Sequence, residues 1–155
     1  MTDPETANAV RRTAARVLLL DGRDRLLLFR GGDPANAAAG TWWFTVGGGL
    51  DEGESLREGA VRELFEETGL RCKATDLGPP VHAEESEFDF AGMHITQHHT
   101  FFVLRVDAHE VDTSGFEALE ASSIVEHRWW TRDELRATSD SVYPRDLVRL
   151  LDRVA

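Results

Sequence analysis

The chain is poor in cysteine, in basic residues and in long apolar segments, and each shortage excludes a class of protein. Its one cysteine, Cys72, excludes an internal disulfide and a metal cage built of cysteines. Lysine and arginine number 17 against 28 acidic residues, which gives a formal net charge of -11 at pH 7. No basic stripe offers the attraction that nucleic acid or an acidic membrane surface requires. We therefore expect neither as a partner.

The chain also lacks the apolar segments of membrane and secreted proteins. No apolar run approaches the ~18 residues of a membrane-spanning helix, and residues 1–10 have no signal-peptide core. We therefore expect a cytoplasmic protein. A chain of 155 residues has the length of one ordinary domain. The expected organisation is a flexible tail over residues 1–12 and a single domain over residues 13–155.

One segment with fixed spacing dominates what the sequence does contain. Gly48 is followed after five residues by Glu54 and, after seven more, by the run Arg-Glu-Leu-Phe-Glu-Glu-Thr-Gly-Leu over residues 62–70. Ser55 and Glu58 form a capping-box pair, and Gly69 suits the left-handed position just past a helix end. The pattern therefore predicts a helix over residues 56–68.

This helix has an apolar stripe that suits docking on a sheet, made of Ala60, Val61, Leu64, Phe65 and Thr68. The adjoining face carries three glutamates. Spacings of three and four residues bring these carboxylates together, which destabilises a helix by roughly 0.2–0.5 kcal/mol per pair. We therefore expect a cation to offset the repulsion.

The three glutamates are Glu63, Glu66 and Glu67. Arg62 can reach Glu66 one turn on, but one guanidinium cannot neutralise all three and Glu54 as well. Hard oxygen donors without His or Cys indicate Mg²⁺, with Mn²⁺ as a substitute, rather than zinc. A solvated acidic helix face is the alternative, although it explains neither the glycines nor the loop glutamate.

The segment resembles the signature box of the Nudix hydrolases, and every fixed position of that box is filled. The resemblance implies an α/β fold, a Nudix-type α/β/α sandwich in which a mixed β-sheet is flanked by helices. It also implies bound metal ions that carry the diphosphate of a nucleoside diphosphate linked to another group. The box spans roughly a seventh of the chain.

Matched position by position, the resemblance implies roles for single residues. The metal ligands that it implies are Glu66 and Glu67, the assisting Glu63, and the backbone carbonyl of Gly47. Arg62 orients a glutamate, whereas Glu54, Gly48 and Gly69 support the site. The glycines at 47–49 let the backbone bend close to the metal. Val46 stands where many members have proline, which leaves the ligands unaffected.

Some members of the family recruit a further glutamate, as base or ligand, from a loop before a late strand. The loop over residues 107–123 offers Glu117 and Glu120, and Glu120 is preferred because it lies nearer the strand. Surface charge is the alternative for both. Trp43 and Arg30 are the candidate substrate contacts.

Paired aromatic residues fall on predicted strands, where neighbouring side chains point to opposite faces. One tryptophan of each pair, 42–43 and 129–130, is therefore expected in the core, and the other faces outward or into a cleft. Packing is favoured over stacking on a base. At most one of His98 and His99 can face a cleft, and a structural role is favoured.

The remaining elements follow from periodicity and turn residues. We predict strands over 13–20, 26–29, 42–46, 81–90, 94–106 and 124–130, with a surface loop over 31–41. Thr131 and Glu134 cap a short helix, and Pro144 opens a terminal helix that reaches about Val154.

The predicted function is that of a Mg²⁺-dependent pyrophosphohydrolase in which activated water attacks phosphorus. Nucleoside triphosphates, dinucleoside polyphosphates and nucleotide sugars all remain open as substrates. A non-catalytic nucleotide-sensing module of the same fold is one alternative, and a structural or interaction protein is another. The chain is expected to be a monomer or a homodimer.

Overall fold

A computed structural model describes residues 9–116 and 118–154 of the chain. Its strands are β1 (Ala9–Leu20), β2 (Leu26–Gly31), β3 (Trp42–Gly49), β4 (His82–Phe90), β5 (Met93–Arg105), β6 (Ile124–Trp130) and β7 (Val142–Tyr143). Its helices are α2 (Leu56–Thr68), α3 (Ala118–Ser123), α4 (Arg132–Ala137) and α5 (Leu147–Val154), with 3-10 turns η1 (Ala37–Ala39) and η2 (Ala74–Leu77).

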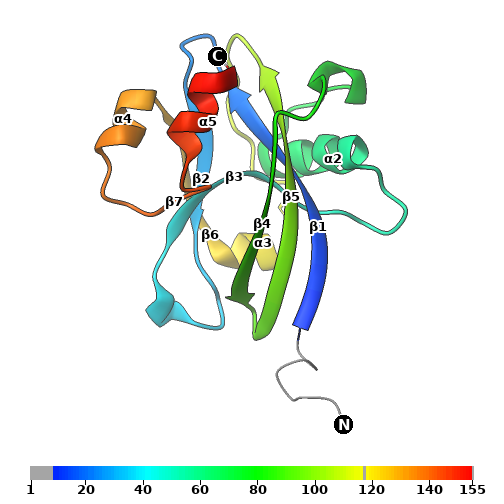
Figure 1. Ribbon diagram of the computed structural model, residues 1–155, viewed down its shortest axis with the longest axis vertical. Coiled ribbons are helices and arrows are strands. Elements are labelled where there is room, and N and C mark those ends of the chain that lie inside the picture. The colour runs from blue at the N-terminus through cyan, green and yellow to red at the C-terminus, as the bar shows by residue number, and fades with distance from the viewer. Residues whose placement is uncertain (1–8, 117, 155) are drawn as a thin grey trace.

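All of these strands join one mixed sheet in the order β4-β5-β1-β2-β3-β7 (Figure 1), while β6 pairs with β2 and β1 also pairs with β3. β1 and β5 run parallel from Ala9 opposite His94 to Leu20 opposite Arg105, whereas β4 is antiparallel to β5. Helices flank both faces of the sheet, which confirms the predicted fold class.

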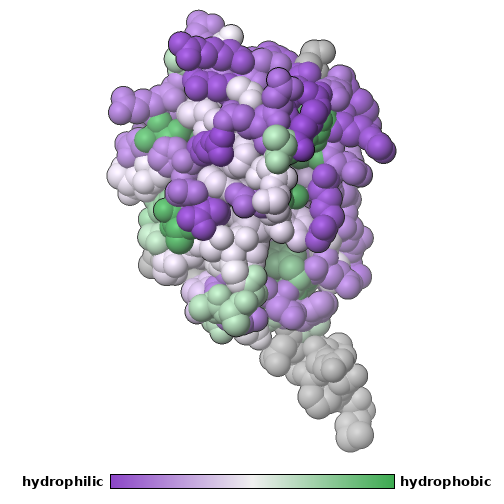
Figure 2. Space-filling view, turned by 90° about the vertical axis from the view of Figure 1, so that its left-hand side faces the viewer, coloured by the Kyte–Doolittle hydropathy of each residue, from purple (hydrophilic) through white to green (hydrophobic). Residues whose placement is uncertain are grey.

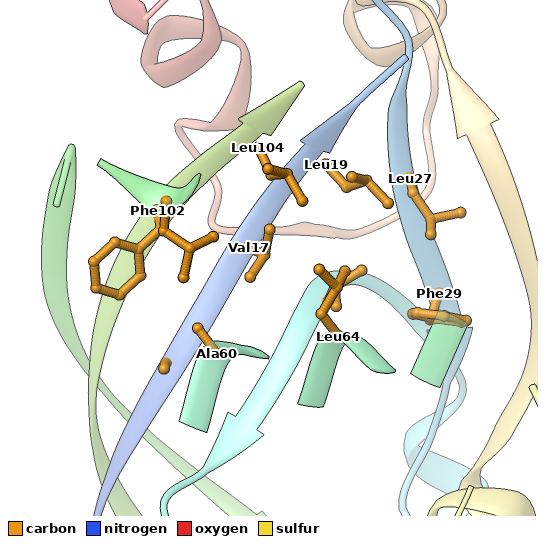
Figure 3. Close-up of a cluster of buried hydrophobic side chains, with 11 residues drawn as sticks. Val17, Leu19, Leu27, Phe29, Ala60, Leu64, Phe102 and Leu104 are labelled. Atoms are coloured by element: carbon orange, nitrogen blue, oxygen red, sulfur yellow. The ribbon is translucent and has the colours of Figure 1, made fainter. Parts of the chain in front are cut away.

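Alternate side chains of β1 enter two separate cores. Val17 and Leu19 pack with Leu64 of α2 on one face (Figure 3). Leu18 and Leu20 pack on the other face with residues of α4 and α5. Because the last part of β1 is buried on both faces, it ends in the unbroken apolar run Val17–Leu20 rather than in an alternating pattern.

The first strand begins earlier than the sequence predicted. β1 starts at Ala9, so residues 9–12, which we assigned to a tail, belong to the sheet. They pair in parallel with the start of β5, and the guanidinium of Arg12 donates hydrogen bonds of 3.0 and 2.9 Å to the side-chain oxygen of Gln97. This pairing joins distant parts of the chain, and no local pattern reveals it.

The later strands that were predicted agree with the structure, whereas the last helix begins later than predicted. Ala91 and Gly92 form the turn between β4 and β5 with positive φ angles, and α4 has its predicted capping box. α5 begins at Leu147 rather than at Pro144, because Tyr143 still pairs with β3 and a turn follows it. β7 and α3 were not predicted.

The surface is largely polar, as the net charge requires. Figure 2 shows hydrophilic residues over most of the face that it views, with only small, separate apolar patches. Among the described residues, no helix is long and apolar enough to cross a membrane.

Candidate active site

The helix that carries the glutamates has the predicted boundaries because its end signals are local. At the start of α2, the Ser55 hydroxyl accepts a hydrogen bond from the backbone N–H of Glu58, and the Glu58 carboxylate accepts one from the N–H of Ser55. At its end, Gly69 is left-handed with φ 75°. A helix fixed at both ends holds its side chains in set directions.

The buried face of α2 differs from the predicted apolar stripe. Phe65 is 39% exposed, whereas the carboxylates of Glu63 and Glu67 belong to residues that are 7% and 1% exposed. The stripe prediction was therefore wrong for Phe65. The carboxylates of Glu63 and Glu67 are buried instead, because the glycines of the loop have no side chains in their way. A Cβ added at Gly48 would lie 2.9 Å from Oε1 of Glu63.

Gly47 links the loop to both faces of the sheet. Its N–H donates a 2.7 Å hydrogen bond to Oε1 of Glu67, and its carbonyl accepts one of 2.8 Å from Nη1 of Arg16. With φ +130°, Gly47 adopts a backbone conformation that other residues rarely reach, and a Cβ there would overlap the carbonyl oxygen of Ala15. Only glycine fits this position.

Arg62 joins the carboxylates of the site. Its guanidinium donates to both oxygens of Glu54 at 2.8 and 2.9 Å, and to Glu63 and Glu66 at 3.1 Å each. It also donates to the carbonyl of Gly49. The hydrogen bonds with Glu54 raise the pKa of Arg62 and lower the pKa of Glu54. Both groups are therefore charged near neutral pH.

A second arginine, Arg16, lies half-buried beneath the loop on the face opposite α2. It donates to the carbonyls of Thr45 and Gly47 and, at 3.3 Å, to Nδ1 of His99. Burial lowers the pKa of Arg16, and the nearby charges of Glu67 and Glu63 oppose that shift.

Burial, followed by the charge of Arg16, lowers the pKa of His99 to about 3, so this imidazole is neutral at physiological pH. Since Nδ1 accepts from Arg16, Nε2 carries the proton and donates to the hydroxyl of Ser86 at 2.7 Å. His99 is therefore a structural link rather than a base for Ser86, in line with the role favoured from the sequence. The sequence missed this cluster because Arg16 and His99 meet only through strand pairing.

The donor chemistry fits a hard divalent cation. Glu63, Glu66, Glu67 and the carbonyl of Gly47 offer only oxygen, which suits Mg²⁺ or Mn²⁺. Within residues 9–116 and 118–154, no three His, Cys, Asp or Glu side chains already form a metal cage. Arg62 instead bridges Glu63 and Glu66. A bound cation would take the place of these Arg62 contacts.

The two candidate substrate contacts have partners outside this cluster. Trp43 is 3% exposed, packs edge-on against Trp130 with ring centroids 5.0 Å apart, and donates its indole N–H to Asp140. The structure thus encloses Trp43, and its contact with substrate stays a prediction. As expected, one tryptophan of each pair is buried in the core.

Arg30 lies on β2 and donates to Glu126 at 2.8 Å and to the Thr41 hydroxyl at 2.9 Å. Its contact with substrate stays a prediction. Glu117 and the side chain of Glu120 lie outside the described residues, so the role predicted for Glu120 also stays a prediction.

Comparison with known proteins adds independent information. A family model described as NUDIX domain matches residues 10–151. The fold is shared with the MutT protein of Methanosarcina mazei Go1, with 22% identity over 93% of this chain and 94% of that one and a TM-score of 0.68.

Two further solved structures share the fold. An Ap4A hydrolase of C. elegans has 17% identity over 92% of this chain and 96% of that one, with a TM-score of 0.60. A MutT NUDIX hydrolase of Burkholderia pseudomallei has 19% identity over 94% and 99%, also with a TM-score of 0.60.

Proposed function

The chain belongs to the Nudix family of hydrolases, and on this premise we propose that it is a Mg²⁺-dependent pyrophosphohydrolase. Its substrate is a nucleoside diphosphate linked to another group. Water attacks one phosphorus, the anhydride P–O bond breaks, and a nucleoside monophosphate or comparable phosphate leaves. The observation that carries this proposal is the pair of buried carboxylates, Glu63 and Glu67, held against a glycine loop.

In this proposal Glu66 and Glu67 would hold the cation and Glu63 would assist. The Gly47 carbonyl, which accepts from Arg16, would complete the coordination with its second lone pair. When bound, Mg²⁺ supplies positive charge to the diphosphate and makes water easier to deprotonate. The formal net charge of -11 makes such a cation useful for binding as well, since a phosphate substrate meets a negative protein.

Other residues keep these groups in place. Arg62 anchors Glu54 and, through it, the loop that precedes α2. Arg16 holds the Gly47 carbonyl from below, so that Gly47 keeps a single orientation. Glu120 is our candidate for the base that takes the proton from the attacking water. A preorganised site of this kind spends little free energy on rearrangement during the reaction.

The substrate class stays broad. Nucleoside triphosphates, dinucleoside polyphosphates and nucleotide sugars all contain a nucleoside diphosphate linked to a second group. The C. elegans protein of the same fold is an Ap4A hydrolase, which supports testing dinucleoside polyphosphates early.

The test is phosphate release from a panel of these nucleotides, with Mg²⁺ and with EDTA, for the native protein and for Glu67→Gln. We expect turnover that needs the cation and that falls at least about a hundredfold in the variant, the scale of losing a group that stabilises the transition state. Glu52→Gln is the matched control, because Glu52 is an exposed residue of the loop before α2. It should keep full activity.

Two results would contradict the proposal. Unchanged turnover in Glu67→Gln would contradict the assignment of Glu67 as a ligand of the cation. Binding of nucleotides without turnover across the panel would favour the nucleotide-sensing alternative.

A further inference from the structure

A pocket of about 420 Å³ lies on the sheet face opposite α2, between β4 and the C-terminal segment. β4 contributes the alternate residues His82, Glu84 and Ser86 to one wall. Residues 143–146 and one side of α5 form the other. The volume is that of a site for a small organic molecule.

Arginines distinguish this pocket from the rest of an acidic protein. Arg145, Arg149 and Arg153 line it at intervals of four residues, against the carboxylates of Glu84 and Asp146. Arg149 and Arg153 lie on α5 and Arg145 precedes it, so the arrangement brings like charges together along one wall of the pocket. It concentrates positive charge where an anion could enter.

Two carboxylates, Glu84 and Asp146, also line the pocket. Among the described residues, none of the three arginines forms a salt bridge. Arg145 donates to the Tyr143 hydroxyl at 3.0 Å, and Arg153 lies 3.5 Å from Nδ1 of His82. Guanidinium groups without carboxylate partners are suited to binding phosphate.

A chain of hydrogen bonds connects the pocket wall to the candidate active site. Ser86 in the wall accepts from His99, His99 accepts from Arg16, and Arg16 donates to the carbonyl of Gly47. His99 and Arg16 therefore connect a residue of the pocket wall to the carbonyl of Gly47 on the face opposite α2.

We propose that this pocket binds a phosphate group of the substrate other than the diphosphate that is cleaved. This inference rests on the proposed function and narrows its substrate class to nucleotides with an additional phosphate. That phosphate is either an ester on the sugar or a continuation of the polyphosphate chain. Arg149 and Arg153 would contact it directly from α5.

The experiment compares dissociation constants within two matched pairs of probes by calorimetry, in EDTA so that metal-dependent turnover is stopped. The first pair is AMP and adenosine 3′,5′-bisphosphate, and the second is ADP and adenosine 5′-tetraphosphate. We expect one pair to show a preference of about tenfold or more for the probe with more phosphate, the scale of one charge-assisted contact. The pair that shows it identifies the source of the phosphate.

Arg149→Gln and Arg153→Gln should each reduce that preference severalfold. Arg23→Gln is the control, since Arg23 is exposed, carries the same charge and does not line the pocket. Equal affinities in both pairs, or a preference that survives both pocket variants, would overturn the inference. Turnover of the nucleotide panel tests the proposed hydrolase activity separately. An active enzyme without this preference would overturn only the inference about the pocket.

Discussion

The two faces of the sheet gather opposite charges around one loop. On the α2 side, Glu63, Glu66 and Glu67 lie beside the glycine loop, two of them in buried positions. On the other side, Arg16 lies half-buried beneath the same loop, and three further arginines line the pocket between β4 and α5. The difference teaches that a chain that is acidic overall can gather carboxylates on one side of a loop and arginines on the other.

Gly47 is the point at which the two faces meet. Its N–H contacts Glu67 and its carbonyl contacts Arg16, so one residue positions both charges. A change here should therefore disturb both sides at once, whereas changes on either side should act separately.

The largest effect on stability is expected for Gly47→Ala. The added Cβ would overlap the backbone carbonyl of Ala15 and lie 2.8 Å from Cα of Arg16, at a φ that alanine rarely adopts. We expect the free energy of unfolding to fall by about 4 kcal/mol or more, measured by urea denaturation. Gly49→Ala is the control, because the nearest atom to its Cβ would lie 3.8 Å away. Equal stability of the two variants would show that the loop can shift freely.

The comparison also separates what the sequence could predict from what it could not. The bounds of α2 follow from Ser55, Glu58 and Gly69, which lie next to the turns that they cap. The carboxylate of Glu63 instead lies against Gly48 of β3, where a side chain would be in its way, and this contact between helix and loop is not a local signal. Local signals therefore predicted the helix, but they placed Phe65 in the core by mistake.

The contacts of Arg16 were harder still to predict from the sequence. Arg16 meets Gly47 through the register of β1 with β3, and it meets His99 through the pairing of β1 with β5. Alternation along a strand showed that one of Trp42 and Trp43 would be buried, but not which one. That choice depends on Trp130, which packs against Trp43 from the far end of β6.

A smaller loss of stability is expected for Arg16→Met, which changes only the arginine that contacts Gly47. The substitution leaves the carbonyls of Thr45 and Gly47 without this donor in a buried region. We expect a loss of about 3 kcal/mol in the free energy of unfolding. Arg12→Met, at the more exposed end of β1, should cost about 1 kcal/mol. Equal losses in the two urea titrations would mean that the loop does not depend on Arg16.

The pH dependence of stability gives a smaller and more specific signal for this side. The folded protein keeps His99 neutral down to about pH 3, whereas the unfolded chain takes up that proton near 6.5. Stability therefore falls as pH drops below 6.5. Between pH 7.5 and 5, His99→Gln should remove about 2 kcal/mol of that fall. His98→Gln, at the exposed neighbour, is the control, and the same pH curve for His99→Gln and the native protein would contradict the buried neutral state.

The most direct test of the acidic side is a Mn²⁺ titration followed by the electron paramagnetic resonance signal of the free ion. The native protein should bind the ion, and the double variant Glu66→Gln/Glu67→Gln should bind it at least about tenfold more weakly, since hard carboxylate ligands are lost. A control that removes Glu85 and Glu87, two exposed carboxylates of β4, should keep native affinity. Equal Mn²⁺ affinity in the Glu66/Glu67 variant and the native protein would contradict the account that these helix glutamates hold the catalytic cation.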